Sequence, residues 1–127
     1  MDYNSNTAQG IDIVSISRIR KAVQRSGKRF LHRIFTSDEL LLHTDYGLLA
    51  TRFAAKEAFF KALGTGISGG VRWHDFSLPP ETEASLRPEV TGVSYDLLEG
   101  RRVLVSVSKT TRTAVAIIVL EGDGESG

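Results

Sequence analysis

The sequence predicts an α+β fold with a mostly antiparallel sheet in a single domain, because its elements are grouped and do not alternate. One strand-like segment comes first, three helix-like segments follow, and several strand-like segments end the chain. The 127 residues suffice for one domain with its own core. We expect that domain to span residues 10–121, between a disordered N-terminus at 1–9 and a flexible tail at 122–127.

The first strand and the first helix are predicted from residue type and apolar spacing. The segment Gly10–Ile16 is rich in the β-branched residues that are typical of strands. A basic helix is expected from about Arg18 to Ile34, with Ser17 as its N-cap. Its inward-facing residues would be Ile19, Val23, Phe30, Leu31 and Ile34.

Two further helices are expected in the middle of the chain. Thr36 or Ser37 can cap a second, shorter helix. The third helix should run from about Leu48 to Leu63 and end at Gly64, a residue typical of left-handed C-caps. The glycine-rich stretch Gly64–Gly70 that follows is predicted to be a mobile loop.

The C-terminal half predicts mainly strands. Trp73–Leu78 is expected to form a short strand, and Pro79–Pro88 a polar connection. Glu89–Leu98 fits a strand or a helix. Arg102–Ser108 and Thr113–Glu121 are expected to be two strands joined by a turn, and the second of them is apolar on both faces, which places it in the centre of the sheet.

Composition excludes several classes of protein. The chain has no cysteine, so it has neither disulfides nor Cys-ligated zinc or iron–sulfur sites. No window approaches the ~18 consecutive apolar residues that span a membrane, and the first nine residues lack the apolar core of a signal peptide. The 41% hydrophobic and 24% charged content is that of a globular protein, which we expect in the cytoplasm.

One segment of the chain is strongly basic although the net charge is only +1. No acidic residue occurs between Asp12 and Asp38. A solvated helix face, a nucleic-acid patch and a docking face for an acidic protein all agree with this pattern. The interval holds seven cations, namely Arg18, Arg20, Lys21, Arg25, Lys28, Arg29 and Arg33.

The third predicted helix carries charges that its surroundings do not favour. Alanine and large apolar residues occupy most of its circumference, yet Lys56, Glu57 and Lys61 lie within it. Glu57 and Lys61 are spaced i, i+4, which on an ordinary surface helix indicates a pair worth ~0.3–0.5 kcal/mol. Here the helix has little solvated surface for such a pair.

Asp12 is also unusual, since it lies between Ile11 and Ile13 in an apolar strand. It can be a strand-end residue that is partly exposed or bonded to a basic side chain. Alternatively, Asp12 and Glu57 with nearby lysines suit a magnesium ion that binds a phosphorylated ligand, because magnesium takes one or two protein carboxylates and shares its shell with phosphate oxygens. The pattern alone does not show that the two carboxylates meet.

Four stretches together resemble a known family. They are GIDIVSISRI, RIFTSDEL, RFAAKEAFFKALGTG and VSVSKTTRTAVAIIVLE, and they cover Gly10 to about Glu121. In order and spacing they are similar to the small bacterial holo-acyl-carrier-protein synthases, which are 4′-phosphopantetheinyl transferases. The resemblance implies an antiparallel sheet packed against a long central helix. It also implies transfer of phosphopantetheine from coenzyme A to a serine of an apo acyl carrier protein, with 3′,5′-ADP as the other product.

The resemblance also implies roles for residues and partners. Magnesium would be held by Asp12 and Glu57, and Glu57 and Lys61 would be catalytic, with Glu57 as a candidate base. The family forms homotrimers with interfacial active sites, and neither nucleic acid nor a membrane is a partner. An acidic carrier protein would dock on Arg18, Arg20, Lys21, Arg25, Lys28 and Arg29. The coenzyme A contacts would be Arg52, Lys56, Lys61, Gly64, Thr65, Gly66, Ser108, Lys109 and Thr110.

Two positions depart from the family pattern. Lys109 stands where the family has a histidine beside the coenzyme A nucleotide, and the glycine common before the later proline, here Pro88, is absent. Lysine keeps a cation but lacks the flat ring and the titration near neutrality. An alternative function is therefore a catalytically impaired module of the same fold that binds the carrier protein or coenzyme A.

Overall fold

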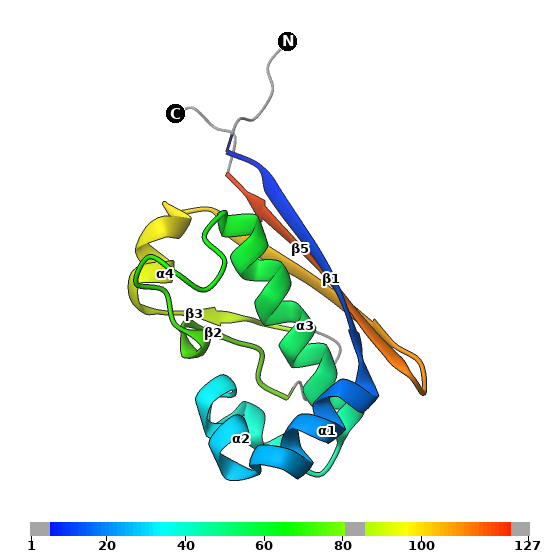
Figure 1. Cartoon of the computed structure of the whole chain (residues 1–127). Helices are drawn as coiled ribbons and strands as arrows, with labels where there is room; N and C mark the ends of the chain where they lie inside the picture. The colour runs from blue at the N-terminus through cyan, green and yellow to red at the C-terminus, as the bar shows by residue number, and fades with distance from the viewer. Residues whose placement is uncertain (1–5, 81–85, 123–127) are drawn as a thin grey trace.

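A three-stranded antiparallel sheet, a long helix that crosses it and smaller elements around that helix make up the described part of the chain (Figure 1). A computed structural model describes residues 6–80 and 86–122. In chain order the elements are β1 (Ala8–Ser15), α1 (Ile16–Ser26), α2 (Lys28–Ile34), η1 (Glu39–Leu42), α3 (Tyr46–Leu63), η2 (Trp73–Asp75), β2 (Phe76–Ser77), β3 (Glu89–Val90), α4 (Gly92–Leu98), β4 (Arg102–Lys109) and β5 (Thr113–Glu121).

The main sheet has the order β1-β5-β4, with both pairs antiparallel. This confirms the central position predicted for the last strand and the predicted α+β class. The first strand therefore pairs with the last, and Asp12 lies opposite Ala116, which lies opposite Val107. Because partners across a sheet share one face, these three residues point toward α3.

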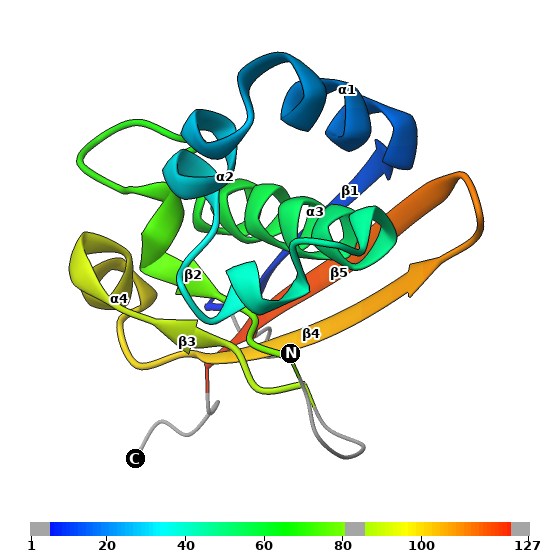
Figure 2. The ribbon, with the colours of Figure 1, turned by 90° about the horizontal axis from the view of Figure 1, so that it is seen from below.

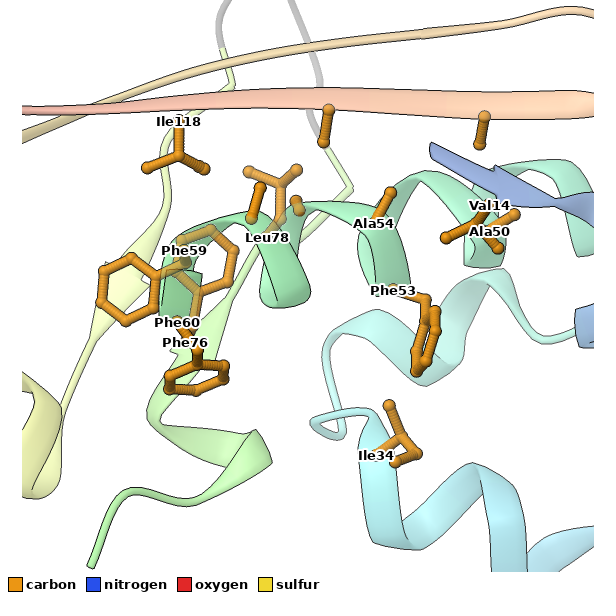
Figure 3. Packing of buried hydrophobic residues seen from close by; sticks show 14 of the residues in the cluster. Val14, Ile34, Ala50, Phe53, Ala54, Phe59, Phe60, Phe76, Leu78 and Ile118 are labelled. Carbon is orange, nitrogen blue, oxygen red and sulfur yellow. The ribbon is translucent and has the colours of Figure 1, made fainter. Parts of the chain in front are cut away.

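Helix α3 packs on this face of the sheet, and its alanines allow the close approach (Figure 3). Ala54 and Ala58 are fully buried under the strands, while Phe53, Phe59 and Phe60 fill the space on the other sides of the helix. Its left-handed C-cap at Gly64, with a φ of 83°, was predicted.

The tightest contact between α3 and the sheet is at Gly10. A Cβ atom placed there would overlap the carbonyl oxygen of Ala58 and lie 3.0 Å from the backbone nitrogen of Ala62. Only glycine fits at this point of β1. The strand is thus pressed against the helix two residues before Asp12.

The smaller elements cover the rest of α3. Seen from below, α1 and α2 lie on the side of α3 away from the sheet, and the β4–β5 hairpin extends along the other side (Figure 2). Strands β2 and β3 form a separate two-stranded ribbon. The buried carboxylate of Asp75 accepts hydrogen bonds from the backbone N–H and the hydroxyl of Ser94. It thereby satisfies a backbone N–H in the first turn of α4 that has no partner within the helix.

Several predicted element boundaries were wrong. The basic helix is not continuous, since Gly27, with a φ of 53°, separates α1 from α2. Ser15 and not Ser17 is the N-cap residue of α1. The second helix is a four-residue 3₁₀ turn, η1, in front of which Thr36 and Glu39 hydrogen-bond each other reciprocally.

Other boundaries differ on the C-terminal side and at the ends. The segment predicted as one strand at Trp73–Leu78 begins with the 3₁₀ turn η2, and Glu89–Leu98 contains both a short strand and a helix. Strand β1 begins at Ala8, so the predicted disordered N-terminus is too long by at least two residues. Residues 1–5 and 123–127 of the predicted ends, and 81–85 of the predicted connection, lie outside the described residues.

The face of the sheet away from α3 carries several exposed apolar side chains. Ile11, Ile13, Leu104 and Ile117 project from it and are between 41% and 64% exposed. We call these four residues the outer apolar face. No helix in the described ranges 6–80 and 86–122 has the length and apolar character to cross a membrane.

Candidate active site

The charged residues of α3 sort onto two faces of the helix. Arg52 and Lys56, one turn apart, point toward η1 and β2. Glu57 and Lys61, also one turn apart, point toward β1 and Asp12. The unusual charge content of this helix therefore belongs to two separate sites.

Lys61 binds Asp12 directly. Its Nζ donates to Asp12 Oδ1 at 2.8 Å and to the Ile11 carbonyl oxygen at 3.1 Å. Asp12 is only 13% exposed, whereas Lys61 is 56% exposed. Asp12 Oδ2 is buried and has no hydrogen-bond partner among the described residues. One carboxylate oxygen of a buried group is thus left available.

Glu57 lies beside Asp12, although 45 positions separate the two in the sequence. Burial, with a hydrogen bond to Asp12 and the charge of Asp12 as further causes, raises the pKa of Glu57 to about 7. The charges of Arg18 and Lys61 act in the opposite direction. The structure therefore brings together the two carboxylates and the lysine that the sequence analysis singled out, and their mutual proximity disfavours full ionisation of the pair.

A divalent cation fits this carboxylate pair. The unpartnered buried oxygen of Asp12 and the neighbouring carboxyl group of Glu57 are oxygen ligands of the kind that a divalent cation prefers. Within the described residues no third His, Asp or Glu completes a group of metal ligands. Asp12 and Glu57 would therefore leave most of the coordination shell to water and to oxygens of a ligand.

Lys56 does not fit its predicted role as a coenzyme A contact, because it is completely buried. Its Nζ forms an ion pair with Glu39 at 2.8 Å and donates to the carbonyl oxygens of Trp73, at 3.1 Å, and Phe76. Burial lowers the pKa of Lys56, and the charge and hydrogen bond of Glu39 partly oppose this. Three acceptors for three N–H donors leave no donor for a ligand.

Arg52 is buried in the same way. Its Nε donates to the Leu78 carbonyl oxygen at 2.8 Å, and its Nη2 donates to that of Pro79 at 3.0 Å. With 2% of its surface exposed, Arg52 holds the chain after β2 against α3. The predicted contact of Arg52 and Lys56 with coenzyme A disagrees with this burial.

Sequence reasoning also missed Glu39 as the partner of Lys56. Its position three residues after Thr36 is a known capping signal.

The remaining predicted coenzyme A contacts lie at opposite ends of α3. Gly64, Thr65 and Gly66 follow its C-terminus, where their N–H groups donate to the Phe60 carbonyl oxygen. Ser108, Lys109 and Thr110 lie near its N-terminus, because the side chain of Lys109 passes over Gly47. An 18-residue helix separates the two groups by roughly 25 Å. One chain does not bring these two groups together.

Four of the six predicted docking residues lie in two separate places, and the other two, Lys21 and Lys28, are exposed. Arg20 stacks over Tyr46, 5.5 Å from the ring centroid, on the side near Arg112. Three others, Arg18, Arg25 and Arg29, line a cleft of about 290 Å³ between α1 and α2. We call this the arginine cleft. Its wall also includes Arg33, which the predicted docking set omitted, and its remaining lining is Ile19, Ala22, Ser26, Phe30 and Phe53.

Comparison with known proteins identifies the family to which the chain belongs. Residues 8–117 match the family model of the 4′-phosphopantetheinyl transferase superfamily. The chain belongs to this superfamily. The transferase is 44% identical to the holo-[acyl-carrier-protein] synthase of Koribacter versatilis over 119 residues, which cover 88% of this chain and 95% of that protein. It is an enzyme of the holo-[acyl-carrier-protein] synthase kind.

Solved structures share its fold. The Helicobacter pylori holo-[acyl-carrier-protein] synthase, crystallised in complex with coenzyme A, superposes with a TM-score of 0.80 at 31% identity, covering 89% of this chain and 99% of that chain. The enzyme from Neisseria meningitidis gives a TM-score of 0.75 at 37% identity and covers 91% and 98% of the two chains. The transferase thus has the family fold over nearly its whole length.

Proposed function

We propose that this enzyme transfers the 4′-phosphopantetheine group of coenzyme A to a serine of an apo acyl carrier protein, releases 3′,5′-ADP and requires magnesium. The observation that carries the proposal is the meeting of Asp12, Glu57 and Lys61 at the edge of α3. Membership of the superfamily and a relative crystallised with coenzyme A support the substrate. No nucleophile of this chain is needed, because the attacking hydroxyl belongs to the partner.

Asp12 and Glu57 would hold the magnesium ion, which when bound neutralises charge on the pyrophosphate of coenzyme A. Lys61 is more than half exposed, so its ammonium group can turn from Asp12 toward a phosphate oxygen. Glu57, which lies beside Asp12, is the candidate to accept the proton of the serine hydroxyl. The serine oxygen then forms a bond to the phosphorus next to pantetheine, and the bond from that phosphorus to the 3′,5′-ADP oxygen breaks.

We further propose a homotrimer in which each active site lies between two chains. The coenzyme A contacts at Gly64–Gly66 and at Ser108–Thr110 lie at opposite ends of α3, so a compact ligand would reach both groups only across two subunits. The outer apolar face offers the surface for such contacts, since exposed patches of this kind often mark protein interfaces. The acidic carrier protein would dock on the basic surface of α1, and the reaction would take place in the cytoplasm.

The test is to incubate the protein with coenzyme A, magnesium chloride and an apo acyl carrier protein, and to measure the mass of the carrier. We expect a gain of one phosphopantetheine group that EDTA abolishes. Asp12→Asn and Glu57→Gln should each lower the rate by at least about 100-fold, with Glu89→Gln, an exposed glutamate far from Asp12 in sequence, as the matched control.

A second candidate function is favoured by Lys109, which replaces the family histidine. If several carriers bind tightly but none gains mass, the protein is a binding module and the transferase proposal is wrong. If Lys109→His preserves or raises the rate, Lys109 substitutes for the histidine without a role of its own. A complete loss in that variant would instead give the lysine a specific function.

A further inference from the structure

Lys61 is the counter-ion of the carboxylate pair at β1 and α3. Its Nζ lies 2.8 Å from Asp12 Oδ1 and is held there by a second hydrogen bond, to the Ile11 carbonyl oxygen at 3.1 Å. Asp12 is 13% exposed, so little solvent screens its charge. Within the described ranges 6–80 and 86–122, Lys61 is its only ion-pair partner. A positive charge of the chain itself therefore already offsets the charge of Asp12.

The ammonium group of Lys61 opposes the binding of a second cation at this carboxylate. Lys61 engages Oδ1, which leaves Oδ2 as the free oxygen of Asp12. Because both oxygens belong to one carboxylate, any cation held by Asp12 and Glu57 is a close neighbour of the ammonium charge, and like charges at short range repel each other. Moving Lys61 aside would break its hydrogen bonds to Asp12 and Ile11. Lys61 thus weakens metal binding for as long as it stays on Asp12.

Lys61 is free to change partners, whereas the other cation near the pair is anchored. The side chain of Lys61 is 56% exposed and extends from the last turn of α3. One of its three N–H donors has no acceptor among the described residues, so a ligand oxygen can engage it before the other two bonds break. Arg18, whose charge also acts on Glu57, is stacked over the Phe53 ring. Lys61 is therefore the cation that a phosphate group can draw away.

We propose that Lys61 couples the binding of the metal to the binding of the phosphate donor. Lys61 holds Asp12 until a phosphate oxygen of the donor takes over its ammonium group, and only then does the carboxylate pair bind a divalent cation tightly. Metal and coenzyme A should therefore bind cooperatively through Lys61, in addition to any direct contact between the two ligands. This inference rests on the proposed function, since it takes coenzyme A as the donor.

The test measures binding of manganese, a paramagnetic probe for the divalent-cation site, from the electron paramagnetic resonance signal of the free ion. Without coenzyme A, Lys61→Met should lower the Kd for manganese by at least about fivefold, because the repulsion and the competing hydrogen bonds are both gone. Lys61→Arg keeps the charge and should stay within about twofold of the wild type. The control is Lys28→Met, which removes an exposed lysine on α2 with the same change of net charge.

A second measurement adds saturating coenzyme A, with a correction for the manganese that free coenzyme A binds. Coenzyme A should tighten manganese binding by a larger factor in the wild type than in Lys61→Met, because only the wild type has a lysine to draw away from Asp12. Linkage requires that manganese raise the affinity for coenzyme A by the same factor in each protein, which titration calorimetry checks. An equal factor in the wild type and in Lys61→Met would overturn the proposal.

The binding measurements need no carrier protein, so they separate this proposal from the transfer reaction. If Lys61→Met weakens manganese binding without coenzyme A, Lys61 orients Asp12 for the metal and the coupling is wrong; it is also wrong if neither protein binds manganese. If the coupling is found but no carrier gains mass, the coupling stands and the transfer reaction is wrong. If mass is gained and Lys61→Met binds manganese like the wild type, the transfer reaction stands and the coupling is wrong.

Discussion

Lys56 and Glu57 are neighbours in the chain, and their surroundings give them unrelated roles. Lys56 is enclosed by Glu39 and two carbonyl groups. Glu57 is half-buried beside Asp12 and holds its proton to near neutral pH. A rotation of 100° about the helix axis separates a buried ion pair from a half-buried carboxyl group with a raised pKa. The consecutive residues Lys56 and Glu57 therefore belong to two different sites of the protein.

The raised pKa of Glu57 predicts how the stability of the metal-free protein depends on pH. The folded value is about 7 against 4.5 for the free group, so the folded state binds the proton more tightly. Stability contributed by this group is complete below pH 4.5 and is lost as the pH rises toward 7. In EDTA, the melting temperature of the wild type should therefore fall between pH 5 and 7 relative to that of Glu57→Gln, as measured by circular dichroism. Parallel profiles for the two proteins would contradict the assignment.

At the scale of elements, the contact between β1 and α3 determines the geometry of the site. Gly10 allows the strand to touch the helix backbone at Ala58. Asp12 lies two residues after Gly10 on the strand, and Glu57 lies next to Ala58 on the helix. The position of this close contact between β1 and α3 explains why two carboxylates 45 residues apart in the sequence meet. Spacing alone does not predict it, because the hydrophobic pattern of either element indicates which face is buried but not the depth of the contact.

The substitution Gly10→Ala tests the role of this contact between β1 and α3. The added methyl group would overlap the Ala58 carbonyl oxygen, so β1 must shift, at a cost of about 1–3 kcal/mol in the free energy of unfolding. We expect weaker magnesium binding in the same variant, because Asp12 moves with the strand. Urea denaturation and magnesium titration measure the two effects. Gln9→Ala, its neighbour with the side chain on the other face, should change neither.

The Lys56–Glu39 pair is a second link between elements, since it joins α3 to η1 and to the backbone at Phe76. Lys56→Met would leave a buried carboxylate without its cation and should destabilise the fold by about 3–5 kcal/mol in chemical denaturation. Adding Glu39→Gln should restore part of this loss, because the amide oxygen still accepts the hydrogen bond from Thr36 or Leu78. Lys28→Met, at an exposed position, is the control.

The same pair shows the limits of sequence reasoning. Lys56 was predicted to contact coenzyme A, because nothing in the local sequence pattern shows that it pairs with Glu39. Helix α3 and strand β5, with their strong apolar patterns, were predicted within two residues of their ends. The break at Gly27 was not predicted, since apolar spacing continues through it. That break places Arg33 in the arginine cleft.

At the scale of the whole molecule, the resemblance to a family supplied what local patterns lacked. The sequence motifs correctly indicated the fold and the meeting of Asp12, Glu57 and Lys61. The residues predicted to contact coenzyme A lie at the two ends of α3, which becomes visible only in three dimensions. This separation is the reason for the proposal that each site is shared between two chains.

Mixing experiments test the shared site. Glu57→Gln removes the carboxylate side of a site, and Lys109→Glu impairs the other side. If each site combines α3 of one chain with the β4–β5 turn of its neighbour, refolded mixtures of the two inactive variants should recover a measurable fraction of wild-type activity. Each variant refolded alone serves as the control. If no mixing ratio recovers activity, the shared site is wrong. Glu57 and Lys109 would then act within one chain, or Lys109 would lie outside the site.

The pairing of the first strand with the last has a consequence for how the enzyme is made. Asp12 lies on β1, which within the described residues forms its ladder with β5 alone. During synthesis the N-terminal strand must wait for residues 113–121 to leave the ribosome before it gains that partner. Such long-range pairing slows folding. A nascent or truncated chain that lacks β5 would therefore lack the strand that holds Asp12, the proposed metal ligand, in place.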